Sequence, residues 1–155
     1  MSKPETRRIA SQVGRSHRGV AWHGPSVMET LEGVDAAKAS AKPHPELHSI
    51  WELVLHVTAW QRMGLQSIEG GEYVSMIGVE DWPLVPADQS PEAWEEATRE
   101  MAGVNERLVA AIRAFPEERL DERVAGREFD FYFLLHGIAQ HNIYHAGQIA
   151  LLKRL

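Results

Sequence analysis

Apolar residues recur at helical spacing along four long segments of this chain, residues 6–33, 49–69, 90–115 and 131–155. This spacing places the apolar side chains on one face of a helix, where they can be buried together. The last segment carries the clearest stripe, made of Leu134, Leu135, Ile138, Ile143, Ile149 and Leu152. Four long helices with almost no strand predict an all-α fold, and specifically a four-helix bundle.

Start and stop signals lie inside or beside these segments. Gly24-Pro25 interrupts the first one, because proline removes a backbone donor and clashes with the preceding helical turn. We expect either a kink there or a fresh helix start with Pro25 near the first position. Ser49 and Glu52 have the spacing of a capping box, and Ser90-Pro91 places an N-cap serine before a proline. These signals predict helix starts near residues 49 and 90.

Two connections between the segments differ in character. Residues 70–89 form a connection that is long for a compact domain, and loops of this length are often lids or binding loops. Residues 123–130, which contain Gly126, predict a turn or a short hairpin.

Composition limits the class of protein. The chain has 155 residues, 44% hydrophobic and 25% charged, which predicts one domain over residues 1–155 with about residues 1–6 flexible. A net charge of −6 gives no overall attraction to phosphate, so no nucleic-acid partner is expected. Nothing resembles a secretory signal, and no stretch approaches the roughly 20 apolar residues of a membrane helix. We therefore expect a cytoplasmic protein with no membrane partner.

The chain has no cysteine, so any bound metal must use nitrogen or oxygen ligands. His141 and His145 are four residues apart, so on a helix both rings project from the same face and can bind one ion. The residue after His141 is Asn142, so the glutamate base of a zinc protease is missing. His56 lies beside the apolar stripe of the second segment. Without a metal, His141 and His145 would be two ordinary histidines of the core or the surface. His56 would then be a partly exposed histidine at the edge of the core.

Several stretches make the chain similar to the DinB/YfiT-like family of metal-binding four-helix bundles. They are residues 21–26 (AWHGPS), 48–56 (HSIWELVLH), 81–83 (DWP) and 136–149 (HGIAQHNIYHAGQI). The resemblance implies up-down-down-up connectivity with a long crossover between the second and third helices. It also implies that one histidine of the second helix and two of the fourth bind a divalent metal, usually nickel or zinc. In this sequence those positions are His56, His141 and His145.

Three neutral imidazoles leave a coordination position open, and open sites of this kind are more often catalytic than structural. The resemblance implies a metal-dependent enzyme that transfers a low-molecular-weight thiol to a small electrophilic substrate, or that hydrolyses a small substrate. A second hypothesis is a metal-binding stress-response or interaction module without turnover. A third is a homodimeric scaffold without physiological metal. No catalytic acid or base is assigned beyond the metal-bound water or thiol.

Other residues near these motifs have competing interpretations. Glu52 is either a partner that orients His56 or the capping-box acid, and we favour the cap. Asn142 and Tyr144 are expected to pack or cap. His23 either faces the metal cavity or marks the helix break, while His136, five residues before His141, is expected to be structural. Three remaining histidines carry weaker signals: His17, His44 and His48.

The tryptophans could line an apolar pocket. Trp51, Trp60 and Trp94 lie at helical spacing, which indicates core positions. Trp82 lies in the long connection and is the best candidate for a lid residue.

Overall fold

The computed structural model describes residues 3–155, and in this range the chain is helical, with no β-strand. The helices are α1 (Glu5–His17), α2 (Val27–Leu31), α3 (Ala36–Ser40), α4 (Ile50–Ile68), α5 (Pro91–Ala114) and α6 (Phe131–Leu152), with a short 3-10 helix at Glu117–Arg119. The predicted all-α class is confirmed. None of these helices combines the length and the hydrophobicity that crossing a membrane requires.

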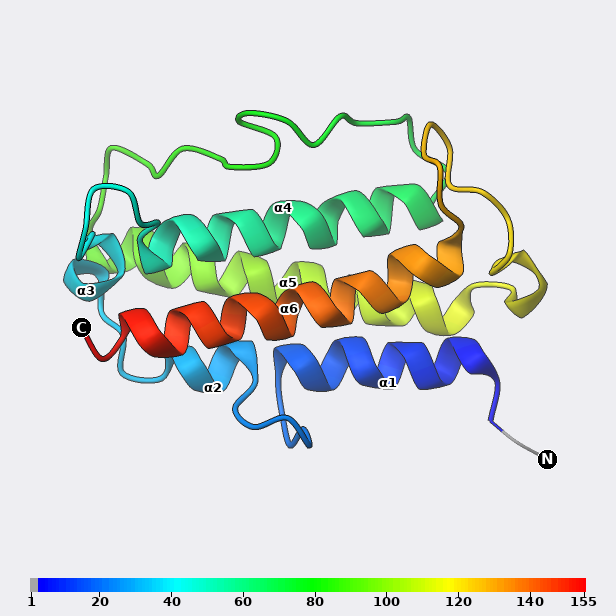
Figure 1. The fold of residues 1–155 in the computed structure, drawn as a ribbon, viewed down its shortest axis with the longest axis horizontal. Coiled ribbons are helices and arrows are strands. Elements are labelled where there is room, and N and C mark those ends of the chain that lie inside the picture. Colours follow the sequence, from blue (N-terminus) through cyan, green and yellow to red (C-terminus); the bar gives the residue numbers. More distant parts are fainter. Residues whose placement is uncertain (1–2) are drawn as a thin grey trace.

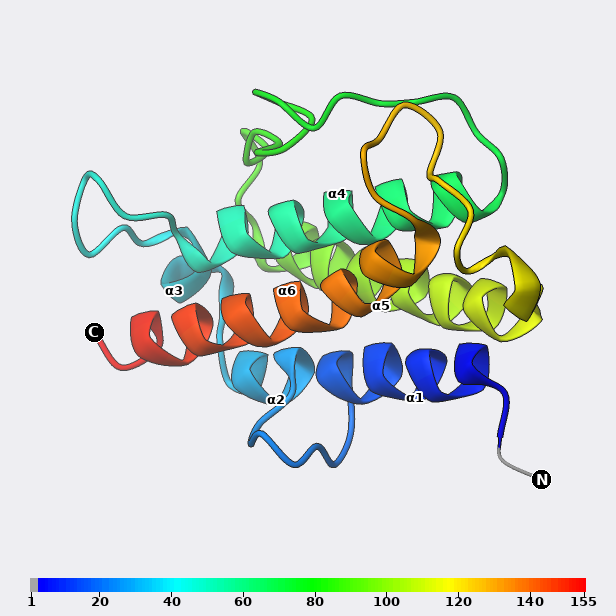
Figure 2. The same ribbon diagram turned by 45° about the vertical axis from the view of Figure 1, so that its right-hand side comes forward.

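The four longest helices, α1, α4, α5 and α6, form the bundle, and each packs against two of the others. In Figure 1, α1 and α2 run from right to left, α4 and α5 from left to right, and α6 from right to left. Because α4 and α5 run in the same direction, residues 69–90 must cross the length of the bundle. Figure 2 shows this crossover passing outside α4, on the side opposite α1 and α2.

Side chains cap three helix starts, and two of these caps, at Ser49 and Ser90, were predicted. The Ser49 hydroxyl accepts a hydrogen bond from the Glu52 amide at 3.2 Å, and the Glu52 carboxylate accepts one from the Ser49 amide at 2.6 Å. Ser90 caps α5 with Pro91 as its first residue. The carboxylate of Asp130 accepts a hydrogen bond from the Phe133 amide and so caps α6. These bonds satisfy amides that have no partner inside the helix.

The first predicted segment differs most from the structure. α1 already begins at Glu5, so Glu5 and Thr6 are helical although residues 1–6 were expected to be flexible; residues 1 and 2 lie outside the described range. The predicted break is present but wider, because the chain leaves α1 at His17 and turns at Gly19 with a φ of 105°. A fresh helix does start there, with Pro25 directly before the N-cap residue Ser26 and two residues before Val27, the first residue of α2. The short helix α3 was not predicted.

The core consists of two apolar clusters separated by buried polar side chains. One cluster joins α2, α3 and α6 to the N-terminal halves of α4 and α5, and the other joins α1 to the remaining parts of α4, α5 and α6. Between them, the Gln61 amide donates to the Asn142 carbonyl oxygen, and the Asn142 amide donates to the Ser16 hydroxyl, both at 3.0 Å. We call Ser16, Gln61 and Asn142 the polar layer. It links α1, α4 and α6 through hydrogen bonds that only this packing can form.

Gly64 marks a close approach between α4 and α6, because a Cβ atom added there would overlap the Ile138 Cδ1 atom. We expect Gly64→Ala to be about 1–3 kcal/mol less stable than alanine at an open helix position would make it, since the extra methyl forces the Ile138 side chain to shift in a packed core. Urea unfolding followed by circular dichroism would measure this loss.

Ile138→Val removes the Cδ1 atom that obstructs the new methyl, so the double variant should be more stable than Gly64→Ala alone. Gly103→Ala is the matched control. Its Cβ meets open space, and it should stabilise the helix by about 0.5–1 kcal/mol. Equal effects of alanine at positions 64 and 103 would contradict this account of the helix contact.

Candidate metal centre

The packing of α4 against α6 brings three histidines together. His56 lies in the first half of α4, and His141 and His145 lie one turn apart on α6. One nitrogen from each ring lies within 4.8 Å of the others, the arrangement expected of residues that could hold one metal ion. His56 and His145 are each 5% exposed, and His141 is half-buried. The sequence interpretation placed the same three residues in one site.

The Nε2 atoms of the three rings converge on one point. His141 Nε2 lies 3.0 Å from His56 Nε2 and 3.0 Å from His145 Nε2. A proton on His141 Nε2 can point at only one of the two neighbours, so the lone pair of the other neighbour is left without a donor. A cation between the rings satisfies all three nitrogens at once. The donor set of three neutral imidazoles therefore fits a divalent metal ion.

The outer nitrogens of two rings point to oxygen acceptors. His56 Nδ1 lies 2.7 Å from the Asp81 backbone oxygen and 3.1 Å from its carboxylate, and His145 Nδ1 lies 2.6 Å from Gln148 Oε1. These acceptors favour the tautomer with the proton on Nδ1, which leaves the Nε2 lone pair free. Metal-binding histidines usually have such a partner on the outer nitrogen. His141 differs, because its buried Nδ1 has no hydrogen-bond partner within residues 3–155.

Burial keeps the three rings neutral. Burial, together with smaller effects of the neighbouring His145 and His56, lowers the pKa of His141 to about 3. Burial lowers the pKa of His145 to about 4 although the bond to Gln148 opposes the shift. The pKa of His56 is also lowered by burial, against an opposing effect of Asp81. Neutral imidazoles at pH 7 can offer their lone pairs without first losing a proton.

The crossover covers the histidines with aromatic and acidic side chains. The Trp82 ring stacks on His56 at a centroid distance of 3.9 Å, and His48 stacks on Trp82 at 3.5 Å. Asp81 Oδ1 also accepts a hydrogen bond from Trp60 Nε1 at 2.7 Å. Trp82 therefore lies over the site, at the position expected of a lid residue.

A second contact holds the crossover near its start. The Arg127 guanidinium donates to the Val74 backbone oxygen at 2.7 Å and lies 4.5 Å from the centre of the Tyr73 ring. Arg127 belongs to the predicted turn, which contains an isolated bridge between Arg123 and Asp130. The crossover is thus attached to the turn before α6 as well as to the histidine site.

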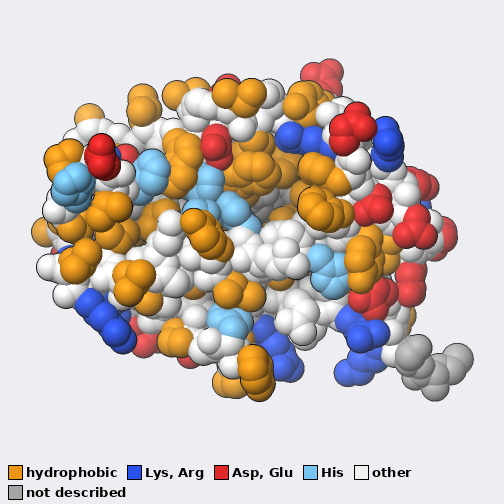
Figure 3. Space-filling model, in the orientation of Figure 1, with side chains coloured by type: hydrophobic (Ala, Val, Ile, Leu, Met, Phe, Trp, Pro, Cys, Tyr) orange, Lys and Arg blue, Asp and Glu red, His pale blue; other side chains and the backbone are white. Residues whose placement is uncertain are grey.

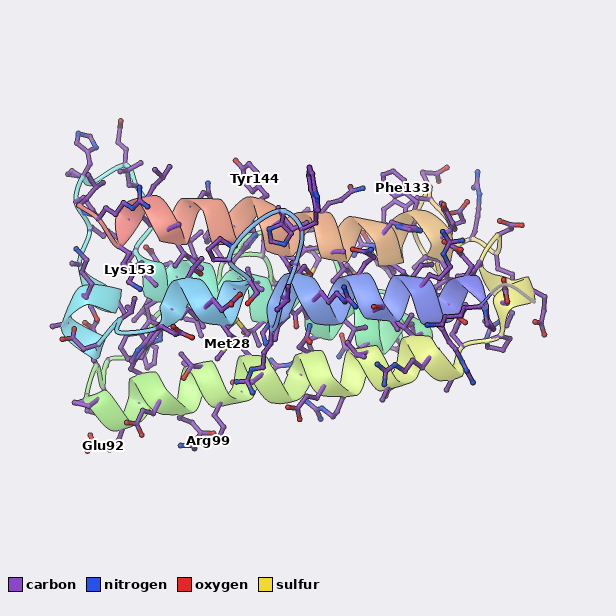
Figure 4. All side chains as sticks on the ribbon, turned by 90° about the horizontal axis from the view of Figure 1, so that it is seen from below. Met28, Glu92, Arg99, Phe133, Tyr144 and Lys153 are labelled. Atoms are coloured by element: carbon purple, nitrogen blue, oxygen red, sulfur yellow. The ribbon has the colours of Figure 1, made fainter. Side chains whose placement is uncertain are left out.

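The remaining candidates lie outside the cluster. Glu52 completes the capping box and pairs with Lys42, so the favoured capping role is correct. Asn142 packs in the polar layer, as expected. Tyr144 is exposed and points away from the bundle (Figure 4), but its ring packs edge-on against the His145 ring at a centroid distance of 5.0 Å. His23 is exposed in the loop between α1 and α2, and it belongs neither to the histidine cluster nor to the lining of the neighbouring cavity. His136 is half-buried, 3.7 Å from Glu5.

Two of the three tryptophans expected in the core are buried there, Trp51 and Trp94. Trp60 is only half-buried and belongs to the wall of the site. The sequence did contain a signal for this position, because Trp60 is four residues after His56 and therefore lies on the same face of the helix. Asp81 and Gln148 were missed as partners of the histidines, although Asp81 directly precedes Trp82 and Gln148 is three residues after His145.

His17 is buried away from this cluster, and neither of its ring nitrogens has a hydrogen-bond partner in the described part of the chain. Burial, with a smaller effect of the Arg18 charge, lowers the pKa of His17 from 6.5 to about 4. The unfolded chain therefore binds more protons than the folded one between these values. The contribution of neutral His17 to the free energy of unfolding is therefore fully present above pH 6.5, and it is lost as the pH falls from 6.5 to about 4.

We expect His17→Leu to weaken this pH dependence. In chelator-treated protein, acidification from pH 7 to about pH 4.5 should cost about 2–3 kcal/mol through His17 alone, and the variant should lack that loss. Urea unfolding at several pH values measures the difference. His23→Leu changes an exposed histidine and serves as the control, so its stability should depend on pH as that of the wild type does. The same dependence in His17→Leu would contradict the prediction.

The family model of the DinB superfamily matches residues 22–149, a range that includes all three histidines. No curated protein and no solved structure matches the chain significantly.

Proposed function

Because the chain belongs to the DinB superfamily, we propose that His56, His141 and His145 bind one zinc or nickel ion and that the protein transfers a small thiol to an electrophile. The convergence of three Nε2 atoms, two of them on rings fixed by oxygen acceptors, is the observation that carries this proposal. A structural metal clamp would be superfluous in a bundle that already has two apolar core clusters. The site is therefore better suited to chemistry than to holding the fold together.

A divalent ion with three imidazole ligands supplies Lewis acidity at its open position and lowers the pKa of a thiol or water that binds there. In the proposed reaction, the thiol sulfur forms a bond to an electrophilic carbon. The leaving group departs with the electron pair of the broken bond, and the thiol proton passes to solvent.

The residues around the histidines prepare the site in two ways. Asp81 and Gln148 hold the outer protons of His56 and His145, so both rings keep the tautomer and orientation that ligation needs. Trp82 and Trp60 cover the cluster with aromatic surface, which excludes water from one side of it. Lower water access strengthens the electrostatic effect of the ion and limits competing hydrolysis.

Thiol conjugation of a generic electrophile tests this function. The untagged, zinc-loaded chain would be assayed with 1-chloro-2,4-dinitrobenzene and a panel of small thiols, among them cysteine and glutathione. We expect turnover with at least one thiol, and a rate for His141→Ala no higher than that of free zinc. His136→Ala changes a histidine on the same helix outside the cluster and should retain the activity.

Equal rates for wild type and His141→Ala would reject metal-based thiol transfer. A full equivalent of bound metal without turnover on any thiol would favour the alternative function, a metal-binding stress-response or interaction module.

A further inference from the structure

An open cavity of about 270 Å³ lies beside the candidate metal centre. Seven residues line it: Trp60, Phe129, Phe133, Leu134, Gly137, Ile138 and His141. They come from α4, from α6 and from the turn that precedes α6. In Figure 3 the surface is hollowed beside a group of histidine atoms, and the interior of the hollow is coloured as hydrophobic.

The lining favours an uncharged occupant. It contains three aromatic side chains, and the Phe129 and Phe133 rings pack against each other at a centroid distance of 5.4 Å. No lysine, arginine, aspartate or glutamate from the described residues belongs to it. A charged group would lose hydration in such a cavity without gaining a partner, whereas an apolar group gains from leaving water.

His141 connects the cavity to the metal centre. This residue lines the cavity, and its Nε2 atom is the one shared between His56 and His145. Trp60 makes a second connection. Its ring is 5.5 Å from the His141 ring, and its indole nitrogen donates to Asp81, the partner of His56. A molecule in the cavity would therefore lie against a proposed metal ligand and its neighbours.

Gly137 keeps part of the cavity open. A Cβ atom added there would have no neighbour within 4 Å, so a larger side chain could extend into the space without displacing the helix. Its position on α6, one turn before His141, places that added bulk on the cavity side. The size is also informative, because a cavity of about 150 Å³ lined by apolar residues is sufficient to bind benzene.

We propose that this cavity is a subsite for an uncharged aromatic group of the electrophilic substrate, held so that the reacting carbon faces the metal centre. This assignment of substrate class rests on the proposed thiol transfer. Trp60, Phe129 and Phe133 bind the ring, and Gly137 provides the room for it.

Fluorobenzene is the test ligand, observed by fluorine NMR in the presence of the full, zinc-loaded chain. We expect saturable line broadening for wild type and at least tenfold weaker binding for Gly137→Leu, whose side chain fills the cavity. Gly147→Leu is the matched control on the same helix, because Gly147 is exposed, has open space around it and lies outside the cavity. It should bind fluorobenzene as wild type does.

Replacing zinc with paramagnetic cobalt tests the distance to the metal. Fluorobenzene bound beside His141 should relax faster in the cobalt-loaded protein than in the zinc-loaded one, and Gly137→Leu should abolish the difference. The cobalt content is measured on the same sample. Failure to bind cobalt would count against the proposed metal function, while the diamagnetic comparison of the two leucine variants would still decide the cavity assignment.

Three results would overturn the subsite. They are absence of fluorobenzene binding, equal affinity of wild type and Gly137→Leu, and tighter binding of 4-fluorobenzoate than of fluorobenzene to the chelator-treated chain, in which the carboxylate has no metal to bind. The last would show that the site prefers a charged ligand, contrary to its lining.

Discussion

Replacement of His141 by alanine is expected to reduce the zinc or nickel bound to the untagged protein from one equivalent to less than a tenth. Its Nε2 atom lies 3.0 Å from the Nε2 atoms of both other histidines, so its loss leaves two rings without their common neighbour. Loss of an outer partner typically costs 10–100-fold in metal affinity, and loss of a direct ligand should exceed this, at about a thousandfold or more. Elemental analysis and competition with a chromogenic chelator would measure both quantities.

His136→Ala is the control for this experiment, because it removes a histidine from the same helix without touching the cluster. It should retain one equivalent of metal. Chelation should lower the midpoint of thermal unfolding for wild type and for His136→Ala, since an ion that binds only the folded state stabilises it. The same treatment should not affect His141→Ala. A full equivalent in His141→Ala would exclude these three residues as the ligand set.

Replacement of Asn142 by alanine is expected to lower the free energy of unfolding by about 2–4 kcal/mol, because buried groups lose hydrogen-bond partners. Asn142 is fully buried. Its side-chain oxygen accepts a hydrogen bond from the Gln61 amide nitrogen, and its own amide nitrogen donates one to the Ser16 hydroxyl. Without it, the Gln61 amide is left unpaired, since the Gln61 carbonyl oxygen already has no partner in the described range. Denaturant unfolding of chelator-treated protein would measure this loss apart from any effect of metal.

Asn105→Ala provides the matched comparison. Asn105 is buried on α5, but its amide nitrogen has no hydrogen-bond partner within residues 3–155. Its removal breaks no such bond and should cost less than about 1 kcal/mol. Equal losses for the two variants would show that the asparagine volume, and not the hydrogen-bonded polar layer, determines stability at this level of the bundle.

The histidine site was predicted more fully than its surroundings. Spacing on one helix was enough to pair His141 with His145. The position of His56 beside the apolar stripe made it a candidate, and the family resemblance placed it in the same site. The role of Asp81 had no comparable signal, because its backbone oxygen reaches His56 from a crossover without a periodic pattern. Trp60 was placed in the core because its spacing matches the apolar stripe, and spacing does not distinguish a buried face from the wall of an open cavity.

The amino-acid sequence by itself determined the elements that depend on near neighbours in the chain. The capping box of Ser49 and Glu52 and the start at Ser90-Pro91 are set by residues at most three positions apart, so they can be read without knowing the fold. The same holds for the apolar stripe of α6 except at Ile143, which is exposed.

Tertiary structure alone decided which side chains meet across the bundle. The polar layer joins residues 16, 61 and 142, and the Nε2 cluster joins residue 56 to a helix 85 positions later. Such contacts depend on helix rotation and on the path of the crossover, which follow from packing the whole core. For this reason the aromatic cavity beside His141 became visible only once α4, α6 and the turn before α6 had been placed in space.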